Sequence, residues 1–425
     1  MKIAIVVQRY GVDINGGAEL HARYIAERLA KHATVEVLTT CARDYVTWRN
    51  ELPPGEDTVN SVRVRRFPVA HPRSPDAFGR LSHLVFDTRH SVADELRWLD
   101  SEGPTSPDLV RYVRAQAGAF DFFVFFSYRY YHAWHGCRAV ADKAILVPTA
   151  ERDAALGVSI FGPVFRMARA LMYNSPEERA LIEHLSGRTG PGVVVGVGSA
   201  IPDHPQPSRF RRKFQARRPF AIYIGRIDEN KGCPELFTYF TRYAAKRPHG
   251  LDLLLVGSNV IEIPAHPRIR HLGFLSDEDK FDALAAADVL IMPSQYESLS
   301  MVALEAWALG KPVLANGRCD VLKGQCLRSN AGLFYESFDE FDQALFHLEA
   351  SGPIGAPLGR NGREFFRKHY SWPVIEQKYL DMFRRLAREP VPAVEPMPGF
   401  FARRARTLPP AADVVAAAPA GAVRS

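Results

Sequence analysis

A strand, a loop and a helix follow one another in a single stretch of this chain, Asp288-Val-Leu-Ile-Met-Pro-Ser-Gln-Tyr-Glu-Ser-Leu-Ser-Met-Val-Ala-Leu-Glu-Ala-Trp307. The first part of this stretch reads as a buried strand that runs into a loop, and the last part reads as a helix that ends before Gly310. Ser298 or Ser300 can cap that helix. Two glutamates, Glu297 and Glu305, therefore flank the N-terminus of a helix.

The region between these two glutamates suits a long ligand with an anionic centre. Free backbone N–H groups and the positive end of the helix dipole favour an anion there. A diphosphate with a hydroxyl-rich group toward each glutamate has the shape of a nucleoside diphosphate sugar. The alternative is that Glu297 is a solvated loop acid and that Glu305 is a helix acid that faces water or an arginine. Glu305 stands between Ala303-Leu304 and Ala306-Trp307, where a solvated charge would be poorly placed, which favours a binding role.

The length and composition predict a globular protein of two domains. The chain has 425 residues, 47% hydrophobic and 24% charged, which is too long for one ordinary core. Its net charge is +7, with basic clusters at 63–66 and 209–218. These clusters can meet an anionic lipid or an acidic donor, or they can be solvated faces. No zinc-finger, helix-turn-helix or RNA-binding pattern accompanies them, so nucleic acid is not an expected partner.

The cysteines and the N-terminus predict a cytoplasmic protein. Five cysteines are scattered, odd in number and without metal-ligand spacing, and they read as reduced thiols: Cys41, Cys137, Cys233, Cys319 and Cys326. The N-terminus runs directly into a first strand rather than a signal peptide. No segment reaches the roughly 18 apolar residues that a membrane span requires. Any contact with the inner membrane face is therefore expected to be peripheral.

The N-terminal part, residues 1–198, is predicted to be an α/β domain with a doubly wound parallel sheet. A strand at 2–7, a helical pattern after Gly16-Gly17 and a strand at 35–38 open such a sheet. Further strands are predicted at 62–67, 120–126, 144–147, 170–173 and 193–195. Residues 40–107 are rich in Pro, Arg and His, and only one strand plus insertions is predicted there. This region is a candidate for shaping an acceptor site.

A second α/β domain of the same kind is predicted for residues 199–370. A Pro- and Arg-rich segment, 198–219, marks the boundary. Strands are predicted at 220–224, 252–256, 269–272, 289–292, 312–315 and 332–335, and helices notably at 233–245, 277–286, 300–309 and 337–349. Residues 371–388 form a separate C-terminal helix in this prediction. Residues 389–425, dominated by Pro and Ala, are predicted to be disordered.

A second motif, Gly225-Arg226-Ile-Asp-Glu-Asn-Lys231-Gly232-Cys-Pro234, follows a predicted strand and opens a helix. Arg226 offers a planar fork of donors and Lys231 a mobile point charge, and this pair of groups can neutralise a diphosphate. Either residue alone would read as a surface cation. Both lie at the same edge of the predicted sheet as Glu297 and Glu305, which favours a common site.

These motifs, together with Gly16-Gly17-Ala18-Glu19, resemble those of the retaining glycosyltransferases of family 4 over about residues 1–388. The resemblance implies the GT-B fold, in which two Rossmann-like domains face each other across a cleft. It implies transfer of a sugar from a UDP- or GDP-type donor with retained anomeric configuration, without a metal or other cofactor. It further implies that Arg226 and Lys231 hold the diphosphate, that Glu297 binds donor-sugar hydroxyls and that Glu305 binds the ribose.

Further residues are candidates for donor binding. Ser298, Leu299 and Ser300 follow Glu297 directly, and Gly273-Phe274 can flank the base, although a strand-end turn explains these two equally well. Gly16 and Gly17 permit close approach of the backbone to a phosphate or an acceptor at a helix start, with a simple tight turn as the alternative. Their spacing is not Gly-x-Gly-x-x-Gly, which disfavours a nicotinamide enzyme.

The first domain departs from the family pattern. Many relatives carry a histidine after the strand that corresponds to 120–126, whereas this chain has Val-Phe-Phe there. Tyr128 and His132 can supply a substitute polar group, but such an aromatic cluster is more often packing. Glu151 and Asp153 follow the next strand and are candidates for the acceptor side.

The expected function is that of a glycosyltransferase of surface polysaccharide or glycolipid biosynthesis, acting on a glycan or a lipid-linked saccharide. Two alternatives are a nucleotide-sugar 2-epimerase of the same fold and a noncatalytic nucleotide-sugar-binding paralogue. The spacing of the two glutamates favours transfer over epimerisation. The missing histidine leaves the paralogue open, while Arg226 and Lys231 with the two glutamates argue against it.

Overall fold

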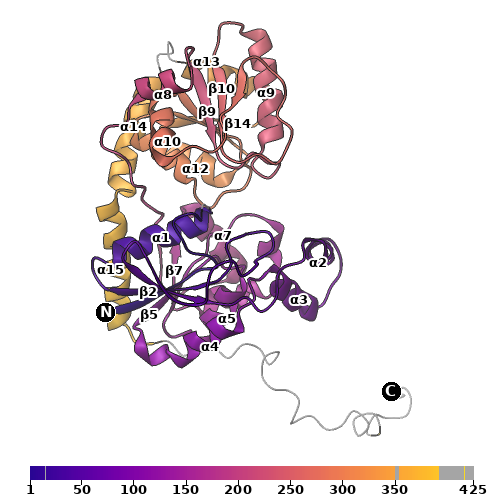
Figure 1. Ribbon diagram of the computed structural model, residues 1–425, viewed down its shortest axis with the longest axis vertical. Coiled ribbons are helices and arrows are strands. Elements are labelled where there is room, and N and C mark those ends of the chain that lie inside the picture. The colour runs from indigo at the N-terminus through magenta and orange to yellow at the C-terminus, as the bar shows by residue number, and fades with distance from the viewer. Residues whose placement is uncertain (15, 350–353, 392–415, 417–425) are drawn as a thin grey trace, which may run out of the picture.

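Two lobes stacked along the long axis make up the molecule (Figure 1). The structure is a computed structural model that describes all residues except 15, 350–353, 392–415 and 417–425. Most of the tail that was predicted to be disordered, 389–425, thus lies outside the described residues.

The lower lobe of Figure 1 contains a sheet with the order β3-β4-β2-β1-β5-β6-β7-β8. Its strands are β1 (Lys2–Val6), β2 (Thr34–Thr40), β3 (Gly55–Val59), β4 (Val62–Phe67), β5 (Phe122–Phe126), β6 (Ala144–Val147), β7 (Ala170–Tyr173) and β8 (Gly192–Val194). All neighbouring strands pair in parallel except β3 with β4. The central strands are continuous apolar runs because helices cover both faces of the sheet.

The helices of this lobe include a group that was not predicted. They are α1 (Gly17–Leu29), α2 (Pro75–Asp87), α3 (Val92–Glu102), α4 (Pro107–Ala115), η1 (Ala117–Ala119), α5 (Tyr131–Ala139), η2 (Ala154–Gly157), α6 (Phe161–Met167) and α7 (Pro176–Ser186). The one strand predicted within residues 40–107, at 62–67, is confirmed as β4, and the segment also forms β3, α2 and α3, which were not predicted. Its α2 and α3 pack against each other at the side of the lobe (Figure 1).

The upper lobe contains a fully parallel sheet with the order β11-β10-β9-β12-β13-β14. Its strands are β9 (Phe220–Ile224), β10 (Asp252–Val256), β11 (Ile269–His271), β12 (Val289–Met292), β13 (Val313–Asn316) and β14 (Gly332–Tyr335). Its helices are α8 (Pro207–Lys213), α9 (Cys233–Lys246), α10 (Asp277–Ala286), α11 (Met301–Ala308), α12 (Asp320–Ser329), α13 (Phe338–Leu348) and α14 (Gly355–His369). Helix α8 lies within the segment that was predicted to be an irregular boundary.

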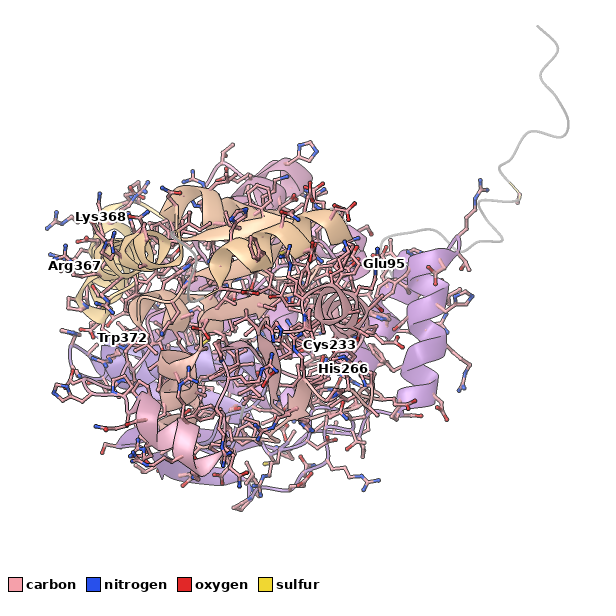
Figure 2. The ribbon with its side chains drawn as sticks, turned by 90° about the horizontal axis from the view of Figure 1, so that it is seen from above. Glu95, Cys233, His266, Arg367, Lys368 and Trp372 are labelled. Carbon is pink, nitrogen blue, oxygen red and sulfur yellow. The ribbon has the colours of Figure 1, made fainter. Side chains whose placement is uncertain are left out.

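The last helix, α15 (Trp372–Arg388), runs from the upper lobe down along the lower one (Figure 1). Phe383 stacks on Phe122 of β5 with ring centroids 5.2 Å apart, and Glu376 Oε2 lies 2.9 Å from His32 Nε2. Gly198 is required at the start of the connection between the lobes, because a Cβ atom there would lie 2.8 Å from the Trp372 ring. Figure 2 shows Trp372 on the same side as Arg367 and Lys368 of α14.

The helices and the cysteines bear on two further expectations. Among the residues that the structure describes, no helix is both long and apolar enough to cross a bilayer. All five cysteines are buried and free, as predicted.

Candidate functional site

Two loops meet at the carboxyl edge of the upper sheet. Strands β9 and β12 are parallel neighbours, so the segments that follow them, 225–232 and 293–300, leave the sheet at the same edge. Gly232 has a φ of +73°, and a Cβ atom there would lie 2.3 Å from the Pro293 carbonyl oxygen. Only glycine permits this close approach, which brings the first loop against the second.

The contact between these loops places Lys231 beside Glu297. The Lys231 Nζ atom lies 2.8 Å from Glu297 Oε1, and the Lys231 amide donates to Asp228 Oδ1 at 2.8 Å. Burial alone would lower the pKa of Lys231, but the charges of Glu297 and Glu151 outweigh it and raise that pKa. The ammonium is thus held firmly in its charged form, as an anion-binding role requires.

Arg226 is held next to Lys231 by a shared partner. Its Nε pairs with Asp228, whose other oxygen accepts from Lys231, and its carbonyl oxygen accepts a hydrogen bond from the Tyr223 hydroxyl at 2.7 Å. Its side chain is 49% exposed. Its Nη groups make no hydrogen bond with any described residue, so they are available to a ligand.

Glu305 is buried in α11, so the solvated reading of this residue is wrong. The side chain is 2% exposed, and its Oε1 accepts from Ser199 Oγ at 2.7 Å and from Lys280 Nζ at 3.1 Å. Its Oε2 has no hydrogen-bond partner among the described residues. One oxygen is therefore fixed by the protein, and the other can accept a hydroxyl group.

The segment between the two glutamates starts the helix as predicted. Ser300 is the N-cap of α11 and accepts from the Ala303 amide at 3.2 Å. Ser298 Oγ accepts from Asn174 Nδ2 of the lower lobe at 3.4 Å, and Leu299 is half-buried against the core. The segment therefore links the two glutamates along the chain and also contacts the lower lobe.

A cavity of about 260 Å³ lies between the lobes next to Glu297. The lower lobe contributes residues of the loop after β6 and of α7, and the upper lobe contributes residues of the loops after β12 and β13. An ion pair between Arg152 Nη2 and Asp320 Oδ2, 3.0 Å apart, bridges the lobes at this cavity. The Arg328 guanidinium pairs with Glu177 across the same boundary.

Three carboxyl groups of the lower lobe line this cavity, those of Glu151, Glu177 and Glu178, and two of them have raised pKa values. Burial, opposed by Lys231 and reinforced by Glu297, raises the pKa of Glu151 to about 7. Burial also raises the pKa of Glu178 to about 8, although the amides of Asn174 and Ala150 donate to it and oppose the shift. Glu151 was predicted for the acceptor side, and it is the acceptor-side candidate that lines the cavity.

The other acceptor-side candidates lie inside the lower lobe. His132 is fully buried, its Nε2 lies 3.0 Å from the Phe126 carbonyl oxygen, and burial lowers its pKa to about 4. The Tyr128 ring is buried against Phe161, and its hydroxyl faces Asp153. Asp153 itself accepts from Arg129 Nη1 at 2.9 Å and caps η2. None of the three lines the cavity: His132 and Tyr128 are buried in packing, and Asp153, partly exposed, is held by Arg129 and by the start of η2.

The predicted glycines occupy two different settings. Gly16 directly precedes α1 and lies against the Glu19 carboxylate, which forms an ion pair with Arg9. Gly17 has no atom near the position of a Cβ, which leaves space for a ligand at the start of α1. Gly273 has a φ of +72°, and Phe274 beside it is 69% exposed. None of these four residues is among those that line the cavity.

Several residues of the site were missed. Asp228 lies inside the Arg226–Lys231 motif, where its position between two cations was a usable signal. Ser199, Lys280, Asn174 and Glu178 carried no such signal, because each acts through a contact that only the tertiary structure creates. Among the described residues, no group of three or more His, Cys, Asp or Glu side chains is placed to hold a metal ion.

Residues 218–348 match the family model described as Glycosyl transferases group 1. We refer to this matched part of the upper lobe as the group 1 domain. The group 1 domain contains both loops of the site and both glutamates. The chain is also 29% identical over 212 residues to the lipopolysaccharide core biosynthesis glycosyltransferase LpsE of Rhizobium meliloti, covering 47% of this chain and 57% of that protein. The chain spans about half the length of such curated relatives.

Solved structures show that the fold extends over both lobes. Sucrose-phosphate synthase from Thermosynechococcus elongatus superposes with a TM-score of 0.67 and 19% identity, covering 91% of this chain and 99% of that one. Anabaena Alr3699/HepE in complex with UDP-glucose gives a TM-score of 0.67 and 17% identity, covering 91% and 100%. The predicted GT-B fold is confirmed, with the group 1 domain as its second half.

Proposed function

We propose that this protein is a retaining hexosyltransferase that transfers a sugar from a UDP- or GDP-type donor to a hydroxyl of a glycan or lipid-linked saccharide. The observation that carries this proposal is the Lys231–Glu297 pair, 2.8 Å apart, beside a cavity between the lobes. A fixed cation suits a diphosphate, and the carboxylate next to it suits sugar hydroxyls. The UDP-glucose bound by the Anabaena neighbour supports a donor of this class.

Each residue of the group 1 domain has a distinct part in this proposal. Arg226 and Lys231 bind the diphosphate and neutralise the charge that develops on it as the glycosyl bond breaks. Glu297 uses Oε1 for Lys231, which leaves Oε2 to orient hydroxyls of the donor sugar. The free Oε2 of Glu305 accepts a ribose hydroxyl. The serines and Leu299 of segment 298–300, Gly17, Gly273 and Phe274 complete the donor site.

Retention of configuration requires no covalent intermediate in this proposal. The acceptor oxygen forms its bond to the anomeric carbon on the face from which the diphosphate leaves. The bond between that carbon and the phosphate oxygen breaks, and the acceptor's proton passes to the departing phosphate oxygen. Glu297, held by Lys231, is then an orienting group rather than a nucleophile.

The proposed acceptor places the reaction in the synthesis of surface polysaccharides or glycolipids, at the cytoplasmic face of a membrane. The similarity to a lipopolysaccharide core glycosyltransferase supports this setting. The basic cluster 209–218 is a weaker support than its sequence implied, because Arg209 pairs with Asp282 and Lys213 with Asp279. Peripheral contact with anionic lipid therefore rests mainly on the class of acceptor.

The first test is a calorimetric titration with uridine, guanosine, adenosine and thymidine diphosphate sugars. We expect binding of one base class without added metal, followed by slow release of the nucleoside diphosphate. No binding to any of the four by the folded protein would overturn the proposal. Conversion of the bound donor into an epimeric donor would instead identify an isomerase.

Replacing Glu297 with alanine tests the assignment of this residue to the donor sugar. We expect the variant to bind the intact donor about 10- to 100-fold more weakly and to bind the free nucleoside diphosphate like the parent protein, because only the donor carries the sugar hydroxyls. Calorimetry with both ligands measures the two affinities. Equal losses for both would contradict the assignment.

A further inference from the structure

The loop after β6 carries the only carboxylate of the predicted acceptor side that lines the cavity described above. Glu151 belongs to this loop, and it lines the same cavity as Glu297, the ion-pair partner of Lys231. The charges of Lys231 and Glu297 also act on the pKa of Glu151, in opposite directions. Glu151 is thus the lower lobe's counterpart to the proposed donor site.

A second glutamate holds this loop in place. Glu178 of α7 is 1% exposed and accepts from the Ala150 amide at 2.6 Å through Oε1 and from the Asn174 amide at 2.5 Å through Oε2. The Asn174 side chain donates a hydrogen bond from Nδ2 to Oγ of Ser298, the residue after Glu297, at 3.4 Å. Both carboxylate oxygens of Glu178 therefore accept hydrogen bonds from backbone amides. One amide belongs to Ala150, which directly precedes Glu151, and the other belongs to Asn174, which contacts the upper lobe.

The lining of the cavity indicates the kind of group that it accepts next to Glu151. Five of the lining residues are carboxylic acids and two are arginines: Glu151, Glu177, Glu178, Glu297 and Asp320, against Arg152 and Arg318. Four of these acids already have partners: Glu177 pairs with Arg328, Asp320 with Arg152 and Glu297 with Lys231, and Glu178 accepts from two backbone amides. Glu151 forms no hydrogen bond or ion pair with a described residue, so it can accept a hydrogen bond from a hydroxyl group.

We propose that Glu151 receives the acceptor hydroxyl and that Glu178 is the positioning residue that holds it there. The group that enters the cavity is a hydroxyl-bearing sugar of the acceptor. This inference rests on the proposed function and assigns the acceptor half of the same site. Ionised Glu151 accepts a hydrogen bond from the hydroxyl and turns its oxygen toward the anomeric carbon. The proton leaves with the phosphate oxygen, and Glu151 returns unchanged.

The charge on Glu151 makes this step dependent on pH. The charged groups that act on it are Lys231, Glu297, Asp153 and Arg129, with Glu178 behind the loop. Burial raises its pKa to about 7, so ionisation, and with it turnover, increases as the pH rises through neutrality. Glutamine is neutral at every pH, so E151Q lacks this dependence.

The kinetic test compares the parent protein with E151Q, using UDP-glucose and GDP-mannose as donors and water as the accepting hydroxyl. We expect E151Q to bind the donor with unchanged affinity, to release nucleoside diphosphate about 10- to 100-fold more slowly and to lose the increase in rate near neutral pH. E178Q should bind donor normally and shift this pH profile, whereas E183Q, on the exposed side of α7, should match the parent protein.

Stability gives a second readout that needs no ligand. Between the ordinary pKa of a glutamate and about 7, folded Glu151 keeps a proton that the unfolded chain releases, so its contribution to stability decreases as the pH rises. We expect the Tm of E151Q relative to the parent protein to increase from about pH 5 to about pH 8.

The outcomes separate this inference from the proposed function. Parent-like turnover and pH profile in E151Q would overturn the inference and leave the donor assignment standing. Failure of the parent protein to bind or turn over either donor would overturn both. A constant difference in Tm across this pH range would also contradict a buried, proton-holding Glu151.

Discussion

Replacing Lys231 with methionine lowers the rate of sugar release from the donor by about 10³-fold, the largest loss expected from any single change in this protein. Methionine retains most of the side-chain volume but removes the positive charge that neutralises the leaving diphosphate. Because that charge matters more as the glycosyl bond breaks, kcat should fall more than donor affinity does.

The surroundings of Lys231 magnify this loss. The ammonium is the partner of Glu297, and it also opposes the rise in the pKa of Glu151. Without it, the raising effects of burial and of Glu297 on Glu151 lose their main opposing charge, so the pKa of Glu151 increases further. We therefore expect the remaining activity of Lys231→Met to require a higher pH than that of the parent protein.

The measurement is the release of nucleoside diphosphate as a function of donor concentration and pH. Lys323→Met is a matched control, because Lys323 forms an exposed ion pair with Glu336 at 2.8 Å on α12. It should retain parent-like kinetics. A Lys231 variant with a higher KM and an unchanged kcat would show that this lysine contributes only to ground-state binding.

The sheets could be predicted because their strands are continuous apolar runs. Strands buried on both faces leave this signal without help from neighbouring segments. Strand β3, Gly-Glu-Asp-Thr-Val, was missed because it is polar and lies at the edge of its sheet. Its partners explain it: Glu56 pairs with Arg65 and Asp57 with Arg66 of β4. Such cross-strand ion pairs become visible only when the register is known.

The donor side of the site could be predicted further than the acceptor side. Lys231 and Glu297 follow strands that are neighbours in a parallel sheet, so their loops were bound to meet. Glu178 reads in the sequence only as part of a helix start, Ser175-Pro-Glu-Glu, and Ser175 does cap α7. Its inward turn toward the Ala150 amide depends on the packing of α7 beside β6 and β7.

Lys280 shows the same limit in the upper lobe. The run Asp277-Glu-Asp-Lys reads as the exposed start of a helix, and α10 does begin there. The structure instead buries the ammonium of Lys280 against Glu305. Burial alone would lower the pKa of Lys280, but Glu305 outweighs it and raises that pKa. Glu305, which is assigned to ligand binding, thus also forms a buried ion pair with Lys280.

Replacing Glu305 with alanine therefore has two effects, which must be separated. The first is on stability: Lys280 loses its buried partner and, among the described residues, retains only the exposed Asp277, 3.5 Å away, so the free energy of unfolding should decrease by about 3 kcal/mol. The second is on binding: both the donor and the free nucleoside diphosphate lose the acceptor of the ribose hydroxyl. We expect affinity for each to decrease about 10- to 100-fold, in contrast to Glu297→Ala.

The double variant Glu305→Gln/Lys280→Met distinguishes these effects. Glutamine retains an oxygen for the Ser199 hydroxyl, and methionine removes the stranded ammonium, so the Tm should return close to that of the parent protein. Affinity for UDP or GDP should stay low, because a neutral amide oxygen binds a ribose hydroxyl more weakly than a carboxylate does. Calorimetric titration of the folded double variant with UDP and GDP measures this affinity. Parent-like affinity would mean that Glu305 serves the fold alone, and the ribose contact would then have to come from elsewhere in the group 1 domain.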